Sequence, residues 1–197
     1  MKVDGLILAA GRSSRMGVTN KVHAVLDGRP LLQHVIERLA PQVHSLSVNG
    51  DPVALGDQQY PIIEDALADF QGPLTGLYSA LVSRMLSDAE YLVIVPCDGP
   101  FVPANLVVEL SRQIVTADSD CACIQYRGFV QPTFSLWHKR VIPLIEQALL
   151  VRKQGGFKPL FNALNTVYID WPERAIDPFF NVNTAEDLNV AEAILCP

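Results

Sequence analysis

Short apolar runs alternate with helical repeats of apolar residues along the whole chain. The runs predict strands at Val3–Ala9, Ser45–Asn49, Pro61–Glu64, Tyr91–Pro96, Cys121–Gln125, Pro132–Trp137 and Thr166–Ile169. Apolar residues three or four positions apart predict helices at Pro30–Leu39, Leu74–Met85, Leu106–Ile114, Val141–Val151 and Thr184–Leu195. This alternation predicts an α/β fold with a mainly parallel sheet and an antiparallel pair at one edge.

Parallel sheets bind ligands at the carboxyl ends of their strands. Several polar residues stand just past predicted strands, so the sequence predicts one site built from the segment Ala9–Lys21 together with Asn49, Asp65 and Asp98. The run Tyr91–Pro96 is apolar throughout, which is typical of a central strand that is covered on both faces.

Composition narrows the classes of protein that fit. A chain of 197 residues with 49% hydrophobic and 18% charged residues is typical of one globular domain, here residues 1–197. The net charge of −6 argues against a broad nucleic-acid or membrane-surface footprint. Four cysteines without metal-ligand spacing, and no export signal, favour a cytoplasmic protein with reduced thiols.

The loop Gly11–Asn20 follows the first strand and is rich in small and basic residues. It is not a Walker A loop, because Met16 stands where the second glycine would be, and Ser13 breaks the dinucleotide fingerprint. Small residues nevertheless let a ligand approach backbone amides, and Arg15 and Lys21 can neutralise phosphate. A phosphate loop and a solvated surface turn remain the two interpretations.

Three side chains at strand ends carry possible chemistry. Asp98 is well placed to hold Mg²⁺, a hard ion that prefers oxygen ligands, or to cap the turn before Gly99. Asp65 has the same two interpretations. Asn49 is suited either to reading a base edge or to closing an Asx turn.

Near the end of the chain, Asn181 and Asn183 precede a helix for which Thr184 and Asp187 form a candidate capping box. Both asparagines suit a binding role or an ordinary turn role. The histidines are scattered and no nucleophile–base pair is visible, which disfavours covalent catalysis.

Taken together, the motifs resemble those of the molybdenum cofactor guanylyltransferases, a family of small nucleotidyltransferases. The resemblance runs through nearly the whole chain, in the segments Leu8-Ala9-Ala10-Gly11-x3-Arg15-Met16-Gly17-x3-Lys21, Gly28–Val35, Glu64-Asp65, Gly72-Pro73-Leu74-Thr75-Gly76, Pro96-Cys97-Asp98-x-Pro100, Gln131–Thr133 and Asn181–Leu188. The glycine loop is shared by the whole superfamily, whereas the later segments are more specific.

The resemblance implies a three-layer Rossmann-like nucleotidyltransferase fold and transfer of GMP from GTP to molybdopterin, with release of pyrophosphate. It implies Mg²⁺ as cofactor and molybdenum cofactor carrier or acceptor enzymes as possible partners. It does not imply binding to nucleic acid or to a membrane. Its residue roles separate into catalytic, nucleotide-binding and acceptor-side groups. The implied catalytic residues are Arg15, Lys21 and Asp98, and Asp98 is the metal ligand. The implied nucleotide-binding residues are Leu8, Ala9, Ala10, Gly11, Arg15, Lys21, Asn49, Asp65 and Asp98. Asn181 and Asn183 are implied on the acceptor side.

The chain also departs from the family pattern. Ala10 stands where a glycine is usual, as in the related cytidylyltransferases, and Asn20 replaces the usual aspartate. Gln131 replaces a frequent histidine, and the arginine-rich stretch is reduced to Arg152-Lys153 and Lys158. A cytidylyltransferase, another nucleotidyltransferase with a related phosphorylated acceptor, and a binding protein that has lost catalysis are therefore alternatives.

Overall fold

The apolar runs form the strands of one central sheet. The computed structural model describes residues 1–10, 24–67, 72–83 and 88–195. In that part of the chain the strands are β1 (Val3–Leu8), β2 (Val25–Leu26), β3 (Arg29–Pro30), β4 (Ser45–Asn49), β5 (Ile62–Ile63), β6 (Tyr91–Pro96), β7 (Cys121–Tyr126), β8 (Phe129–His138) and β9 (Thr166–Asp170).

The helices of the described residues lie mostly between strands. They are α1 (Leu31–Leu39), α2 (Pro52–Leu55), α3 (Pro73–Val82), α4 (Leu106–Thr116), α5 (Ile142–Glu146), α6 (Phe157–Phe161) and α7 (Ala185–Leu195), with short 3-10 turns at Ala40–Gln42 and Lys139–Val141 and a π-helical turn at Gln147–Val151. Among the described residues, no helix is long and apolar enough to cross a membrane.

The strand order of the main sheet is β5-β4-β1-β6-β8-β7-β9, seven strands within the described chain. β1 pairs in parallel with β4 and β6, and β7 pairs in parallel with β9. β8 runs antiparallel to both β6 and β7. The expected α/β fold with a mainly parallel sheet is confirmed, and β6 is the predicted central strand.

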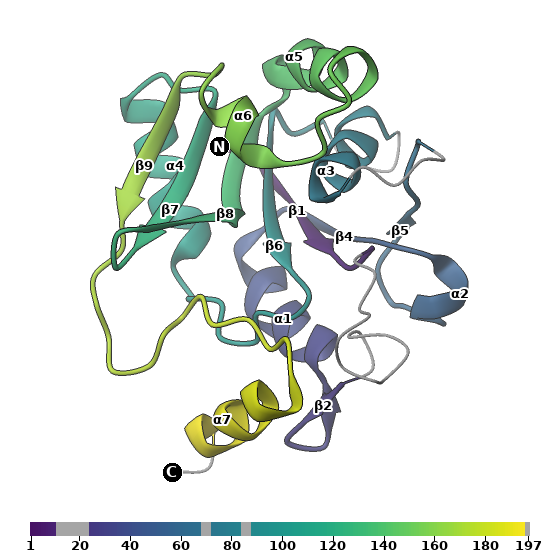
Figure 1. Ribbon diagram of the computed structural model, residues 1–197, viewed down its shortest axis with the longest axis vertical. Helices are drawn as coiled ribbons and strands as arrows, with labels where there is room; N and C mark the ends of the chain where they lie inside the picture. Colours follow the sequence, from purple (N-terminus) through teal and green to yellow (C-terminus); the bar gives the residue numbers. More distant parts are fainter. Residues whose placement is uncertain (11–23, 68–71, 84–87, 196–197) are drawn as a thin grey trace.

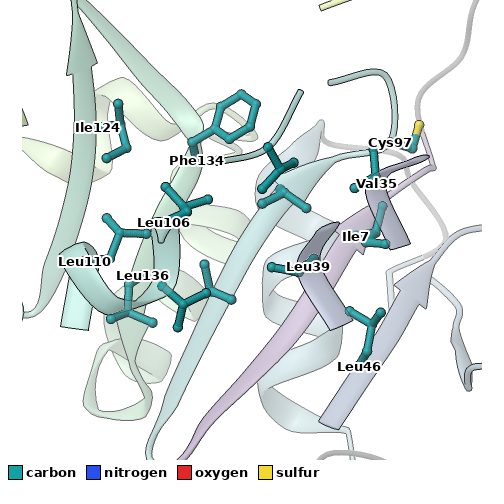
Figure 2. Packing of buried hydrophobic residues seen from close by; sticks show 14 of the residues in the cluster. Ile7, Val35, Leu39, Leu46, Cys97, Leu106, Leu110, Ile124, Phe134 and Leu136 are labelled. Atoms are coloured by element: carbon teal, nitrogen blue, oxygen red, sulfur yellow. The ribbon is translucent and has the colours of Figure 1, made fainter. Parts of the chain in front are cut away.

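Two hydrophobic clusters cover the two faces of the sheet and make three layers (Figure 1). On one face, residues of α1 and α4 pack against the inward side chains of the strands, as Val35, Leu39, Leu106 and Leu110 do in Figure 2. On the other face, α3, α5 and α6 contribute the second cluster. This two-sided cover explains why β6 is apolar throughout.

Some elements differ from the sequence expectation for identifiable reasons. A small hairpin, β2–β3, precedes α1, and its turn residues Asp27 and Gly28 have φ values of 49° and 72°. Two consecutive positive φ angles are typical of the type I′ turn that favours Asp-Gly. The helix expected at Val141–Val151 is broken into a 3-10 turn, α5 and the π turn, where Arg152 N donates to Gln147 O at 3.2 Å.

Strand β8 contains a bulge opposite the middle of β7. Cys123 pairs with Ser135, whereas Ile124 pairs with Gln131, so the intervening residues of β8 leave the ladder. Pro132 lies in this stretch and has no backbone N–H to donate. The bulge brings Phe134 close to Gly99, where an added Cβ would lie 2.9 Å from the phenyl Cζ.

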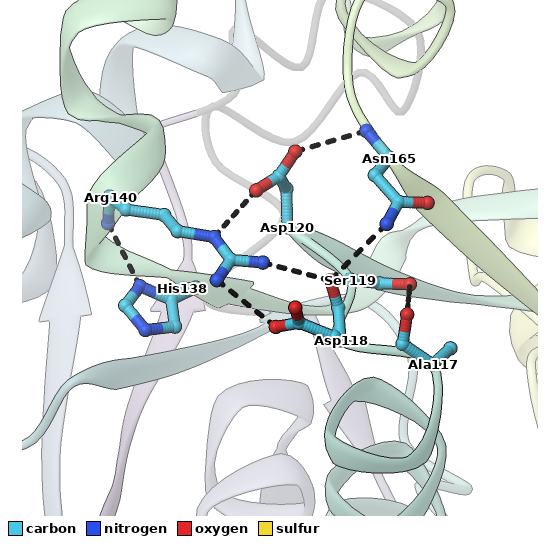
Figure 3. A network of polar contacts seen from close by, with 7 residues as sticks. All are labelled: Ala117, Asp118, Ser119, Asp120, His138, Arg140 and Asn165. Carbon is cyan, nitrogen blue, oxygen red and sulfur yellow. Dashed lines mark hydrogen bonds and ion pairs between the residues drawn. The ribbon is translucent and has the colours of Figure 1, made fainter.

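A polar network closes the amino end of the sheet (Figure 3). The Arg140 guanidinium pairs with Asp120 Oδ1 at 2.6 Å and donates to the Asp118 carbonyl at 3.0 Å. Asp120 Oδ2 accepts from Asn165 N at 3.0 Å, and His138 Nδ1 accepts from Arg140 N at 3.0 Å. These contacts join the start of β7, the end of β8 and the start of β9.

Candidate nucleotide site at the carboxyl end of the sheet

Three adjacent parallel strands end together and bring several predicted site residues to one place. The register aligns Leu8 with Asn49 of β4 and with Pro96 of β6. The backbone continues this alignment past the strands, because Ala9 N donates to Asn49 O at 2.8 Å and Cys97 N donates to Leu8 O at 3.1 Å. The residues that follow β1, β4 and β6 are therefore neighbours.

Asn49 is the best-fixed side chain of this group. It is 1% exposed, and its Nδ2 donates to Ile63 O and to Asp65 Oδ1, both at 3.0 Å. The Asn49 side chain therefore does not close an Asx turn. Instead it links the ends of β4 and β5. Ala66 N donates to Ser79 Oγ at 2.8 Å, which ties the segment after Asp65 to α3. Asn49 and Asp65 form one polar wall.

Gly76 on α3 completes that wall, although the sequence reasoning did not single it out as a site residue. A Cβ at this position would overlap Asn49 Oδ1 and lie 2.9 Å from Leu8 Cδ2. Only glycine lets the helix come this close to the Asn49 amide. The signal in the sequence is the segment Gly72–Gly76, whose second glycine lies inside a helix, where glycine costs stability.

Asp98 and Asn181 form the second part of the site. Val182 N donates to the Asp98 carbonyl at 2.8 Å, so the segment before α7 is tied to the turn after β6. An added Cβ on Gly99 would lie 3.2 Å from Asn181 Oδ1. That oxygen is buried and has no hydrogen-bond partner among the residues that the structure describes. A carbonyl oxygen left unsatisfied beside Asp98 is available to a ligand or a cation.

Asn183 is an exposed residue at the start of the capping box that precedes α7. Its backbone N donates to Asp187 Oδ2 at 2.9 Å, and its Nδ2 donates to Asn181 O at 3.2 Å. The box is confirmed, since Thr184 N also donates to Asp187 Oδ2 and Asp187 N donates to Thr184 Oγ1. Asn183 therefore helps to shape the turn that carries Asn181.

An aromatic cluster holds the segment that leads to Asn181. The Phe179 ring lies edge-on to Phe134, Tyr126 and Trp171, with centroid distances of 5.0, 5.5 and 5.5 Å. Tyr126 Oη also accepts from Arg174 N at 3.3 Å. Edge-to-face aromatic contacts fix ring orientation as well as burying area, so the backbone before Asn181 is held firmly in place.

The predicted phosphate loop lies outside the residues that the structure describes. Gly11, Arg15 and Lys21, with Asn20, lie in residues 11–23, beyond the described part of the chain. Their roles stay predictions. Ala10 is the last described residue before them and is half-buried next to Ala9, so the loop begins directly at the site.

Two of the described cysteines and one histidine, Cys121, Cys123 and His34, are buried in the core. Burial raises the pKa of Cys123 to about 12 and also raises that of Cys121, so both remain protonated thiols in the core. His34 is buried and contacts the Leu26 carbonyl at 2.8 Å through Nε2. Within the described chain no group of three or more His, Cys, Asp or Glu side chains is placed to hold a metal.

A Rossmann-like sheet with an amide–carboxylate wall after β4 and β5 and a carboxylate after β6 is typical of nucleotide-binding α/β proteins. Residues 5–167 match the MobA-like NTP transferase domain. The chain belongs to this family.

Relatives of known sequence or structure agree with this assignment. The chain is 36% identical over 196 residues to the molybdenum cofactor guanylyltransferase of Rhodopseudomonas palustris (strain BisB5), covering 96% of this chain and 92% of that one. The Vibrio cholerae protein of the same name is 37% identical over 184 residues, covering 93% and 88%. Molybdopterin-guanine dinucleotide biosynthesis protein A from Archaeoglobus fulgidus superposes with a TM-score of 0.82 at 23% identity, covering 100% and 99%.

Proposed function

We propose that this protein transfers GMP from GTP to the molybdenum cofactor and so forms the guanine dinucleotide cofactor with release of pyrophosphate. The observation that carries the proposal is the clustering of Asn49, Asp65, Asp98 and Asn181 at the carboxyl end of β4, β1 and β6. Proteins that share 36% and 37% of its sequence are named for this reaction.

In this proposal the nucleoside lies against the end of β1. Leu8, Ala9 and Ala10 offer backbone close to the base and ribose, and the buried Asn49–Asp65 pair offers a fixed polar surface. A preformed pair binds with little ordering cost, because the Asn49 side chain is already held by its hydrogen bonds to Ile63 O and Asp65 Oδ1. The carboxylate is an acceptor for the N–H donors that guanine presents.

The reaction is a phosphoryl-type displacement. An oxygen of the acceptor's terminal phosphate forms a bond to the α-phosphorus of GTP, the bond between that phosphorus and the α–β bridging oxygen breaks, and pyrophosphate leaves with the bond's electron pair. Positioning and charge neutralisation supply most of the catalysis in such reactions. The roles proposed for Arg15 and Lys21 are contacts with the triphosphate, and for Asn181 and Asn183 the acceptor side.

A magnesium ion fits the residues present. Asp98 would supply a carboxylate, and the buried, unpartnered Asn181 Oδ1 is an oxygen donor near the same turn. Two protein oxygens are typical for Mg²⁺, which keeps water and phosphate oxygens in its remaining positions. When bound, the ion would neutralise charge on the phosphates and on the departing pyrophosphate.

We also propose a cytoplasmic location and delivery of the product to a carrier or acceptor enzyme. The described cysteines Cys97, Cys121 and Cys123 are buried and form no disulfide with one another, as is typical of proteins in a reducing compartment.

The test is incubation of the purified protein with molybdopterin cofactor, Mg²⁺ and one nucleoside triphosphate at a time. We expect pyrophosphate and the guanine dinucleotide with GTP. Product with CTP but not GTP would replace the base assignment by that of a cytidylyltransferase. Binding of GTP without turnover under any condition would indicate a binding protein that has lost catalysis.

The Lys21→Ala variant tests the phosphate loop. Removing the ammonium should weaken GTP binding by about 10-fold or more, because hydrogen bonds to charged phosphate are the strong class. Calorimetric titration of GTP measures this. The matched control is Lys2→Ala, which removes a lysine that pairs with Asp88 at 3.0 Å and should bind GTP as the wild type does. Equal GTP affinity in the two variants would show that Lys21 does not contact the nucleotide.

A further inference from the structure

A third hydrophobic cluster lies apart from the two that cover the sheet. Its buried members, each at most 7% exposed, are Ala24, Leu26, Leu31, Phe101, Val182 and Ala191. Partly buried side chains of Phe180, Leu188, Ile194 and Leu195 pack against them. The cluster joins the β2–β3 hairpin to α7, and these two elements contact each other at one end of the molecule (Figure 1). We call it the hairpin–helix cluster.

The hairpin–helix cluster takes its side chains from three segments, and each segment follows a residue that the proposed function uses. The pairs, each site residue with the cluster member that follows it, are Lys21 with Ala24, Asp98 with Phe101, and Asn181 with Val182. In every pair the two residues are at most three positions apart in the chain. A cluster that served only to anchor α7 could take its partners from any part of the surface. This one connects the segments proposed to contact the triphosphate and the acceptor.

Val182 is the member of the cluster with the most direct connection to the site. Its side chain is fully buried in the cluster, while its backbone N donates to the Asp98 carbonyl at 2.8 Å. The side chain of the preceding residue, Asn181, reaches the same turn, since a Cβ on Gly99 would lie 3.2 Å from Asn181 Oδ1. The packing of this valine therefore bears on the spacing between the Asp98 turn and the Asn181 amide.

Two separate clusters hold the chain on either side of Asn181. Phe179, two positions earlier, is buried in the cluster on the α1 and α4 face of the sheet. Val182, one position later, is buried in the hairpin–helix cluster. Either side chain would lose buried contacts if the segment moved, so packing on both sides sets the position of Asn181. Loss of one anchor should allow the amide to shift.

The hairpin that supports Val182 is itself held by hydrogen bonds. Leu31 N donates to Ala24 O at 2.9 Å. His34 Nε2 lies 2.8 Å from Leu26 O, and because a carbonyl oxygen only accepts, the imidazole carries a proton on Nε2 and donates it. His34 is a buried residue of α1, the helix that covers one face of the sheet. The hairpin is therefore a firm support for the segment around Val182.

We propose that the hairpin–helix cluster is a positioning device for the transfer step, with Val182 and Phe101 as positioning residues. The inference rests on the proposed function, in which Asn181 faces the acceptor and Asp98 faces the phosphates. The cluster holds the two turns that carry these side chains at a fixed spacing, and so aligns the acceptor phosphate with the α-phosphorus. The wall proposed to contact the nucleoside has no member in the cluster. Loosening the cluster should therefore slow transfer without weakening GTP binding.

Val182→Ala removes the link between the cluster and the site, and Val141→Ala is the matched control. Both valines are at most 1% exposed, but Val141 packs in the cluster on the α3 and α5 face of the sheet. Because the same atoms are removed, both variants should melt about 3–10 °C below the wild type. At about 25 °C, kcat of Val182→Ala should fall about 10-fold or more, while its Kd for GTP stays within about 2-fold. Val141→Ala should keep the wild-type kcat, and Phe101→Leu should show the Val182→Ala pattern to a smaller degree.

Hydrogen exchange gives a second readout that does not depend on turnover. The amide of residue 182 is protected by its hydrogen bond to the Asp98 carbonyl. In Val182→Ala the protection factor of this amide, which corrects for the intrinsic exchange rate of each residue type, should fall about 10-fold. In Val141→Ala it should be that of the wild type, because local opening of the turn leaves Val141 packed.

The proposed function and the positioning role fail in different ways. Absence of turnover by the wild type would overturn the proposed function, and the protection factors alone would then decide whether the cluster holds the turn that carries Asn181. A wild-type kcat in Val182→Ala, or an equal loss of kcat in Val141→Ala, would overturn the positioning role. Equal protection of residue 182 in the two variants would overturn it as well.

Discussion

At the amino end of the sheet, Arg140, Asp118, Asp120 and Asn165 satisfy one another through side chains and backbone (Figure 3). At the carboxyl end, Asn181 Oδ1 and the Thr75 hydroxyl are buried without a hydrogen-bond partner in the described part of the chain. Polar side chains lie at both ends of the sheet. They differ in whether the polar groups use up their hydrogen-bonding capacity within the chain.

The difference separates two uses of polar side chains. A closed network stabilises the geometry of strand ends and offers nothing to a ligand. Unsatisfied atoms cost about 1–3 kcal/mol each when buried, so they persist where a bound group repays the cost. An unsatisfied hydrogen-bonding atom on a buried polar side chain is therefore a better sign of a ligand site than the presence of a titratable group. The following predictions test this contrast, from the largest expected effect to the smallest.

Asp98→Ala should abolish turnover, with a loss of at least about 100-fold, because it removes the carboxylate proposed to hold Mg²⁺ next to the phosphates. The hydrogen bond from Val182 N is retained, since it goes to the Asp98 backbone, so the variant should still fold and unfold cooperatively. Steady-state pyrophosphate release and thermal unfolding measure the two effects. Wild-type turnover in this variant would refute the metal role.

Gly76→Ala should damage both binding and stability. The new methyl group would overlap Asn49 Oδ1, and overpacking of this kind costs about 1–3 kcal/mol. Calorimetry should show weaker GTP binding because the Asn49–Asp65 pair must move. Gly156→Ala is the control: a Cβ there meets nothing within 4 Å, so binding should stay unchanged. Full GTP affinity in Gly76→Ala would mean that the Asn49 wall does not contact the nucleotide.

Arg140→Gln should affect stability alone. The ion pair with Asp120 is partly exposed, so its loss should cost roughly 1 kcal/mol or less, about 2–4 °C in melting temperature. The difference from the wild type should shrink in high salt, because screening weakens exposed pairs. Turnover should be that of the wild type. An Arg140→Gln variant that is stable but inactive would contradict the inference that the amino-end network serves stability alone.

His138→Asn should have the smallest effect, visible only in its pH dependence. Burial, and then the Arg140 charge, lower the pKa of His138 in the folded state. A folded pKa below the unfolded value means that stability falls as the pH drops through the unfolded pKa of about 6.5. Asn keeps an acceptor for Arg140 N but does not titrate. Between about pH 7.5 and 5.5 the variant should lose less stability than the wild type in parallel denaturant titrations, and identical losses would contradict the assignment.

Much of the fold was predictable because local patterns decide it. Apolar runs located β1, β4 and β6, and the capping box at Thr184 located the start of α7. The same patterns identified Asn49 and Asp98, because strand ends meet at one edge of a parallel sheet. The Asp27-Gly28 turn was equally readable, but its two-residue strands are too short to show alternation.

Other features depend on tertiary contacts that no local pattern reveals. The role of Gly76 follows from the approach of α3 to Asn49, which is 27 positions away in the chain and unconnected by any repeat. The approach of Phe134 and Asn181 to Gly99 likewise joins residues that are far apart in the chain. The π turn at Gln147–Val151 has no sequence signal that we can identify.

The position of β6 between β1 and β8 also bears on how the chain folds as it is synthesised. β1 and β4 can pair early, but the other edge of β1 waits for β6. About 45 further residues separate these events, roughly 2–9 s at translation rates of about 5–20 residues per second. Asp4, the second residue of β1, accepts a hydrogen bond from Ser45 Oγ at 2.7 Å, which links β1 to β4 before β6 has been synthesised. Unpaired strand edges can pair with other chains, so this edge of β1 is open to such pairing until β6 has been synthesised.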